Sequence, residues 1–173
     1  MEYRKGMTLL EVVFAITLIV FLVSAISFVY IVSLRGWTNL GHHSDVHEKL
    51  HFGLERIVRD VRGAKAMSIA SHALRFTLYE GGVDNSYIYY LYNPSDPWIP
   101  AYNQTNYDLR RTSLSGGIGG TFTYGSGEII ITNLKPPNST TITSSGNVAS
   151  LTLVGQAGDD ALTVRGYVRP RNV

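Results

Sequence analysis

Residues 4–34 read RKGMTLLEVVFAITLIVFLVSAISFVYIVSL, and this stretch decides how the chain is organised. Residues 12–34 contain no charged residue, no proline and no glycine. A helix rises about 1.5 Å per residue, so these residues span about 35 Å and exceed a bilayer core of about 30 Å. The stretch therefore predicts one transmembrane helix near the amino terminus.

The charges that flank this helix predict its orientation. Arg4 and Lys5 precede it, and the positive-inside tendency places the amino terminus in the cytoplasm and the residues after Arg35 outside. A secretory signal peptide fits less well, because its apolar core is shorter and ends at an A-x-A-like site, which we do not find. We expect a single-pass protein of the cytoplasmic (inner) membrane, in contact with its lipid, with an extracytoplasmic carboxy-terminal domain.

Glu11 is the one carboxylate at the mouth of this apolar helix. An ionised side chain at the centre of a membrane helix costs roughly 2.5–3.5 kcal/mol, and such residues are usually functional. Two explanations stay open. Glu11 lies in the cytoplasmic headgroup zone beside Arg4 and Lys5, or it pairs with a positive charge of another chain in a low dielectric.

The segment GMTLLE, residues 6–11, resembles the prepilin processing site of type IV pilins and type II secretion pseudopilins. That pattern is a short basic leader ending in glycine, a bulky apolar residue, threonine, two apolar residues and glutamate. Met7 stands where phenylalanine is commonest. The resemblance implies cleavage after Gly6 by a prepilin peptidase and N-methylation of Met7. It also implies that Glu11 faces the Met7 amine of a neighbouring subunit in a filament.

After Arg35 the helix is expected to continue, with an apolar stripe that includes Val46, Leu50, Leu54 and Val61. The rest of the chain has the alternation and turn signals of short antiparallel strands. These lie at residues 74–79, 86–92, 109–114, 128–132, 148–153 and 162–167, with residues 121–124 as a further candidate. The expected fold is α+β, a pilin-like lollipop in which a sheet packs on the outer half of a long helix. Its expected parts are a leader (1–6), a transmembrane helix (7–35), an amphipathic extension (36–66) and a β domain (67–173).

The two closing strands contain SLTL (150–153) and LTVRGYVRPRN (162–172), and they resemble J-type minor pseudopilins and W-type minor pilins. This resemblance implies a structural subunit that catalyses no reaction and that starts or caps a type IV pilus or a type II secretion pseudopilus. Its implied partners are other pilin subunits, the prepilin peptidase and the inner-membrane assembly platform. Residues 93–120 and 133–147 would be the variable loops that meet partners.

An enzymatic alternative comes from HEKLH, residues 47–51, which has the H-E-x-x-H spacing of zinc proteases. His47 and His51 fall on one helical face, and His43 extends the row. A catalytic zinc ion needs a third ligand and a cleft. The nearby candidates have no recognisable spacing; they are His72, Glu55 and Glu80. We therefore favour a solvated helix face over a membrane-tethered zinc protease, and expect no metal, no cofactor and no enzymatic activity.

Composition narrows the remaining choices. The chain has 173 residues, a formal net charge of +2 and no cysteine, so disulfides are excluded and a nucleic-acid partner is not suggested. We interpret residues 155–160 as a turn rather than a calcium loop. Residues 116–120 are interpreted as a flexible connection rather than a phosphate loop. Trp37 is expected at the outer membrane interface. A membrane-anchored binding or sensor domain that never assembles remains the main alternative to a pilin.

Overall fold

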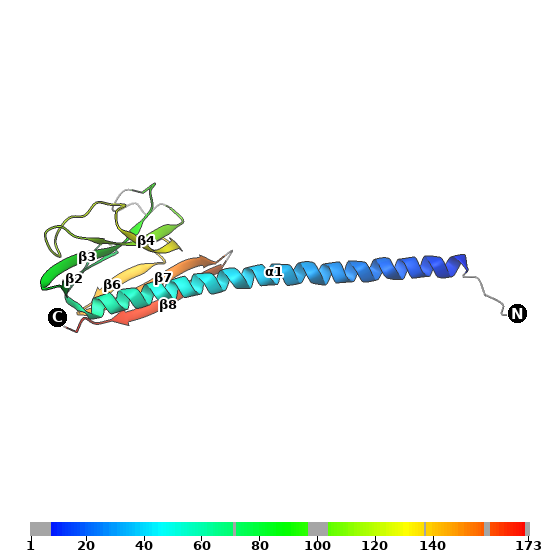
Figure 1. The fold of residues 1–173 in the computed structure, drawn as a ribbon, viewed down its shortest axis with the longest axis horizontal. Helices are drawn as coiled ribbons and strands as arrows, with labels where there is room; N and C mark the ends of the chain where they lie inside the picture. The colour runs from blue at the N-terminus through cyan, green and yellow to red at the C-terminus, as the bar shows by residue number, and fades with distance from the viewer. Residues whose placement is uncertain (1–7, 71, 97–103, 137, 158–159, 172–173) are drawn as a thin grey trace. The chain divides into compact units, whose positions relative to one another are not determined.

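The computed structural model describes residues 8–70, 72–96, 104–136, 138–157 and 160–171 (Figure 1). One helix, α1 (Leu9–Arg62), precedes the strands. The strands are β1 (Ala64–Ala70), β2 (Ala73–Glu80), β3 (Val83–Tyr92), β4 (Tyr107–Ser113), β5 (Glu128–Leu134), β6 (Thr141–Ser145), β7 (Val148–Ala157) and β8 (Asp160–Val168). The chain divides into two compact units, residues 1–41 and residues 42–173.

The first unit is the amino-terminal part of α1. Its segment Leu9–Trp37 has 29 residues and a mean hydropathy of 2.9, and it is long and apolar enough to cross a membrane. The hydroxyls of Thr17 and Ser24 donate to the carbonyls of Val13 and Val20, each at 2.8 Å, which satisfies them within the helix. The structure thus confirms an apolar helix near the amino terminus, a property that membrane anchors and signal sequences share.

In the second unit, the rest of α1 packs on the sheet through the predicted apolar stripe. Leu50, Ile57 and Val61 are fully buried. Glycines let helix and strands approach closely: a Cβ atom on Gly155 would lie 2.8 Å from Val46, and one on Gly166 would lie 2.8 Å from Leu54. The expected packing of an amphipathic helix on the β domain is confirmed.

The sheet is antiparallel throughout. Its strand order is β1-β2-β3-β4-β5-β7-β6, and β8 pairs with the other edge of β7. β5 joins β7 through a single residue pair, Leu134 with Gly155, while β6 pairs with residues 148–152 of β7. With β8 along the whole of β7, the outer edges of the sheet are β1, β6 and β8.

The two faces of the sheet bury two apolar clusters. Alternate residues of a strand point to opposite faces, so Tyr89 and Leu91 of β3 join the core under α1, whereas Ile88 and Tyr90 join a smaller cluster. The segment between β4 and β5 covers this second cluster with Phe122 and Tyr124. An α+β fold with an antiparallel sheet is therefore confirmed.

Several predicted boundaries were wrong. The helical extension was expected to reach residue 66, but α1 ends at Arg62 and residues 64–70 form β1. The expected loop 133–147 contains β6, and Gly155, expected in a turn, lies inside β7. Residues 121–124 form no named strand, and Thr121 makes an isolated bridge with Ser115.

The missed strands have a common physical reason. β1 reads AKAMSIA and β6 reads TITSS, so neither has a run of large apolar residues. β1 is held by the hairpin with β2, and β6 by five residue pairs with β7. Pairing with a neighbour, rather than intrinsic propensity, makes these segments strands.

Candidate functional site

The first candidate site is the start of α1, where Thr8 and Glu11 bind each other. The Thr8 backbone N–H donates to Glu11 Oε2 at 2.9 Å, and its hydroxyl donates to the same oxygen at 3.1 Å. The Glu11 backbone N–H donates to Thr8 Oγ1 at 3.3 Å. This is a capping box, in which two side chains satisfy the free N–H groups of a helix start.

The capping box gives Glu11 a role within its own chain. The T-x-x-E spacing of residues 8–11 is the sequence signal for it, although we did not use that signal in the sequence analysis. Gly6 and Met7, where cleavage and methylation are expected, lie outside the described residues. Both hydrogen bonds from Thr8 to the Glu11 side chain use Oε2, and a carboxylate has further acceptor positions on its other oxygen.

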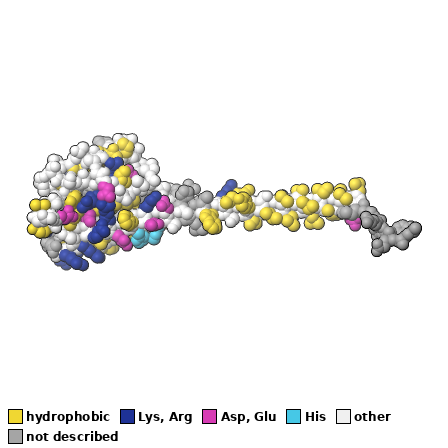
Figure 2. All heavy atoms as spheres, in the orientation of Figure 1, with side chains coloured by type: hydrophobic (Ala, Val, Ile, Leu, Met, Phe, Trp, Pro, Cys, Tyr) yellow, Lys and Arg dark blue, Asp and Glu magenta, His cyan; other side chains and the backbone are white. Residues whose placement is uncertain are grey.

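The apolar surface that follows Glu11 is exposed along its whole length (Figure 2). Leu9 is 83 % exposed, Phe21 is 74 % exposed and Phe28 is 70 % exposed. No part of the described chain buries the most apolar window of this helix. Contiguous apolar surface of this extent needs lipid or protein around it. Trp37, expected at the outer membrane interface, is also exposed.

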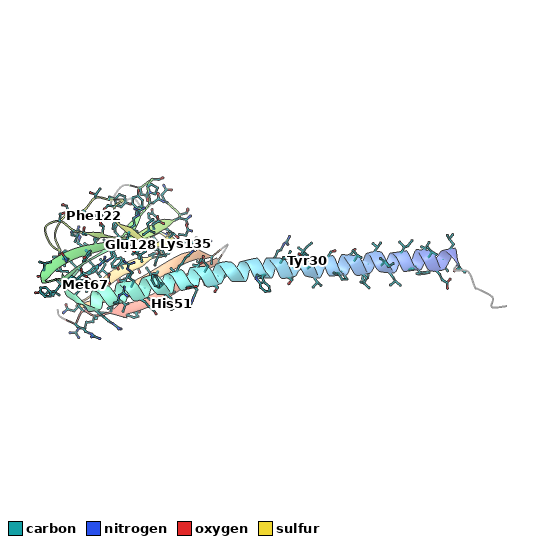
Figure 3. The ribbon with its side chains drawn as sticks, in the orientation of Figure 1. Tyr30, His51, Met67, Phe122, Glu128 and Lys135 are labelled. Atoms are coloured by element: carbon teal, nitrogen blue, oxygen red, sulfur yellow. The ribbon has the colours of Figure 1, made fainter. Side chains whose placement is uncertain are left out.

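The histidine pair of HEKLH lies on the exposed face of α1 (Figure 3). The rings of His47 and His51 are 4.5 Å apart between centroids. Lys49 within the motif donates to Asp45 at 2.7 Å, and His43 Nε2 lies 3.3 Å from Asp160 Oδ2. The helix therefore places the two imidazoles together, as its spacing predicts.

A third metal ligand does not join this pair in the described part of the chain. Among those residues, no group of three or more His, Cys, Asp or Glu side chains is arranged to hold a metal ion. Glu80, one of the candidates, accepts a hydrogen bond from the Tyr87 hydroxyl at 2.9 Å. The described geometry therefore offers two imidazoles and no catalytic zinc centre.

A partly buried polar cluster fastens α1 to β3 and β4. The Tyr89 hydroxyl donates to Asp60 Oδ2 at 2.8 Å, and Arg111 Nε lies 3.1 Å from the same oxygen. Burial, and next the negative charge of Asp60, raises the pKa of Tyr89 far above its usual value. The Arg111 guanidinium also stacks 3.9 Å from the centre of the Tyr87 ring. The charges of this cluster neutralise one another, which fits a structural role.

A second ion pair joins α1 to β5. Arg56 donates to both oxygens of Glu128, at 2.7 and 2.5 Å. The hydrogen bond from Arg56 lowers the pKa of the Glu128 carboxyl, and the same bond raises the pKa of Arg56. This pair fixes the helix to β5, the strand next to β4.

The segment between β4 and β5 is held by hydrogen bonds and ring contacts. Arg75 Nη1 donates to the carbonyls of Ile118 and Gly120 at 3.2 and 2.8 Å, and the Tyr90 hydroxyl donates to the Ser126 carbonyl at 2.6 Å. The glycine-rich residues 116–120 lie between two strands and do not lead into a helix, so they lack the structure of a phosphate loop.

Two loops are only partly described: the segment 155–160, interpreted as a turn, and the proline-containing loop between β3 and β4. Gly155 belongs to β7, Asp160 begins β8 and approaches His43, and residues 158–159 lie outside the described residues. Trp98 lies outside them as well. In the described part of the proline-containing loop, the Tyr107 hydroxyl donates to Asp96, and burial with this acceptor raises the pKa of Tyr107 to about 12. This hydrogen bond joins the described start of the loop to β4.

Comparisons with known protein families, with curated proteins and with solved structures find no match to this chain.

Proposed function

We propose that this chain is a minor pilin or pseudopilin, a structural subunit that waits in the inner membrane and then joins a filament. One observation carries the proposal: Leu9–Trp37 is an apolar helix whose surface the described chain leaves exposed, and it begins inside the GMTLLE motif of residues 6–11. Lipid covers this surface before assembly, and the apolar helices of neighbouring subunits cover it afterwards. The prepilin peptidase cleaves after Gly6, and Met7 is methylated.

The start of α1 supports a charge pair between subunits. The capping box holds the Glu11 carboxylate at the first turn of the helix, one turn from Met7 in sequence. The rotamer of Glu11 is fixed by Thr8, so a neighbouring amine meets an ordered carboxylate and loses less entropy on pairing. In low dielectric, a subunit in the wrong register leaves a buried charge without a partner, which costs several kcal/mol.

A membrane-anchored binding or sensor domain that never assembles is the second candidate. The observation that favours it is the same capping box, because Glu11 already has a partner within its own chain. In that case, Glu11 is needed to start α1 but does not pair with another subunit.

Two substitutions separate these functions, because they separate the cap from the charge. Glu11→Gln keeps the capping box, which glutamine also forms, and removes the negative charge. Thr8→Val keeps the charge and removes the cap. The measurement is incorporation of each variant into filaments in a host that carries the assembly machinery. Thr8→Ser, which retains the hydroxyl, is the matched control.

The proposal expects Glu11→Gln to lose incorporation at least tenfold, with normal amounts in the membrane. Thr8→Val should lose less, because the charge remains. If Glu11→Gln assembles like the unmodified chain and Thr8→Val does not, Glu11 acts only as a cap and the chain is not assembled by a charge pair. If neither the variants nor the unmodified chain enter filaments, a membrane-anchored domain that never assembles explains the chain better than a pilin.

A further inference from the structure

The outer face of β8 combines arginines with an exposed aromatic ring. Val164 and Val168 are buried, and Gly166 faces α1, where a Cβ atom would meet Leu54 at 2.8 Å. Arg165 and Tyr167 alternate with them, so they project from the opposite face of the sheet, and both are exposed. Arg169 follows the last residue of β8 and is exposed as well. Alternate residues of a strand are about 6.6 Å apart, so Arg165 and Tyr167 are neighbours along this face.

The neighbouring strands extend this face with hydroxyl groups. Arg165 lies opposite Thr152, and Tyr167 lies opposite Ser150. β6 continues the same face, since Thr141 pairs with Thr152 and Thr143 pairs with Ser150. β6 and β7 contain no Asp or Glu, and Asp160, the acidic residue of β8, approaches His43. The outer face of the three strands is therefore neutral and hydroxyl-rich, with positive charge along one edge.

More positive charge lies at the carboxy-terminal end of α1, on the helix side of the sheet. The Arg171 backbone N–H donates to the Arg62 carbonyl at 3.2 Å, which brings the residues after β8 to the end of the helix. Arg59, Arg62 and Arg171 line an open groove of about 740 Å³, in which Glu55 is the acidic lining residue. Figure 2 shows Lys and Arg side chains gathered on this unit.

These arginines are largely free to bind an external anion. Within the described residues, no carboxylate lies within 4 Å of the side chains of Arg62, Arg165, Arg169 or Arg171. Arg59 lies 4.0 Å from Asp60, whose carboxylate already bonds to Tyr89 and Arg111. The whole chain has a formal net charge of only +2, so its net charge does not reveal this local excess of unpaired arginines.

We propose that the outer face of β8, with Arg165, Tyr167 and the adjoining Arg169, binds single-stranded nucleic acid. Guanidinium groups recognise phosphate oxygens through paired N–H donors, and Ser and Thr hydroxyls also donate to phosphates. Tyr167, 70 % exposed between two arginines, offers a flat ring on which a base stacks. An acidic peptide uses the arginines equally well but gains nothing comparable from an exposed ring, which favours the nucleic acid. The proposal does not depend on cleavage after Gly6 or on filament assembly.

The test uses the full chain in a neutral detergent and a fluorescent oligothymidylate of about 20 nucleotides, a length that covers one or more sites of this kind. Anisotropy is measured between about 50 mM and about 200 mM salt. For single strands, the logarithm of the binding constant should fall against the logarithm of the salt concentration by about 0.7 per neutralised phosphate. Replacing both Arg165 and Arg169 by Ala should reduce this slope by roughly 1.4.

The ring is tested separately from the charge. Tyr167→Ala should weaken oligothymidylate binding by about tenfold through loss of a stacked base, and Tyr167→Phe should restore it. Lys49→Ala is the matched control for charge, because Lys49 is already paired with Asp45 on another surface. Arg165→Lys with Arg169→Lys keeps the charge and should keep the salt slope. All of these side chains are exposed, so the unfolding midpoint should stay unchanged and is measured alongside.

Three results would overturn the proposal. The first is no binding of oligothymidylate at about 50 mM salt. The second is binding that the double Ala variant leaves unchanged. The third is equal binding of polyglutamate, with Tyr167→Ala without effect on either ligand, which would assign the surface to an acidic protein partner. Because processing at Gly6 is measured on the mature amino terminus, failure here is distinguishable from failure of the proposed function.

Discussion

The two parts of α1 use their apolar residues in opposite ways. In residues 42–62, Leu50, Ile57 and Val61 are fully buried beneath the sheet. In residues 9–37, similar side chains are exposed, among them Ile19, which is 62 % exposed. This difference in exposure comes from what surrounds each part and not from the helix itself, because both parts belong to one continuous α-helix. The second part has its apolar partner within the chain, whereas the first must find lipid or another helix outside it.

The same comparison applies to the glycines of the helix. Gly53 lies where α1 touches Ile131 of β5, whereas a Cβ atom on Gly36 would meet no atom within 4 Å. One glycine is required by close packing within the unit of residues 42–173. The other is left without contacts in the unit of residues 1–41. Four substitutions test which contacts stabilise the unit of residues 42–173, and we describe them in order of decreasing effect on its stability.

The largest effect is expected from removing a buried isoleucine. Ile57→Ala should lower the free energy of unfolding of the β-containing unit by about 3 kcal/mol, through lost apolar burial and a residual cavity. Ile19→Ala removes the same atoms from an exposed position and should leave that free energy unchanged. Denaturant titration of the full chain in detergent, followed by the near-ultraviolet signal of the tyrosines, measures both. Equal effects of the two substitutions would contradict the division.

The next effect concerns the buried polar cluster at the end of α1. Tyr89→Phe removes the hydroxyl that donates to Asp60 and should cost about 1.5 kcal/mol, typical of a hydrogen bond to a charged group. Tyr79→Phe is the control, because Tyr79 is 59 % exposed and its contact with Lys65 uses the ring. Thermal unfolding of both variants measures the difference in stability. A Tyr89→Phe variant as stable as the Tyr79→Phe variant would show that the cluster adds nothing.

Gly53→Ala should destabilise by about 1 kcal/mol. The added Cβ would lie 2.2 and 2.4 Å from two side-chain atoms of Ile131, and overpacking of this kind costs about 1–3 kcal/mol. The higher helix propensity of alanine offsets up to about 1 kcal/mol of this cost. Gly36→Ala gains the propensity without the contact, so the β-containing unit should unfold as before. Stabilisation by Gly53→Ala, measured by denaturant titration, would mean that Ile131 moves away freely.

The smallest effect concerns the ion pair of Arg56 with Glu128, whose carboxyl pKa lies below its ordinary value. The stability that it adds is present above the pKa of the unfolded chain, about 4.3, and is lost as the pH falls through the lower pKa of the folded state. Because Glu128 is half exposed, we expect a few tenths of a kcal/mol. Glu128→Gln should lack this acid-dependent part of the stability. An unfolding curve whose pH dependence is unchanged in this variant would contradict the assignment.

The parts of the fold that the sequence predicts are those with strong local periodicity. The uninterrupted apolar run predicts the first part of α1, and the recurrence of Leu50 and Leu54 predicts the buried face of the second. Strands β2 and β7 have clear apolar alternation, β3 has a tyrosine-rich apolar run, and all three were located. β1 and β6 were missed because their small and hydroxyl-bearing residues become strands only through pairing with β2 and β7.

Long-range contacts were also beyond the sequence. Asp60 and Arg111 meet only because α1 crosses β4, and nothing in their local sequences marks them as partners. The capping box differs, because Thr8 and Glu11 are three residues apart and their spacing contains the information. The shared face of Arg165 and Tyr167 likewise follows from their spacing once residues 160–168 are known to form a strand. Local spacing predicts such features, whereas packing determines the rest.

The mature amino terminus is the most direct test of the central claim that the exposed apolar helix belongs to an assembling subunit. The measurement is mass spectrometry of the full chain, purified from the membranes of a host with an active prepilin peptidase. The account predicts a chain that begins at Met7, carries a methyl group on its terminal nitrogen and lacks the residues up to Gly6. A chain that keeps residues 1–6 in that host would contradict it.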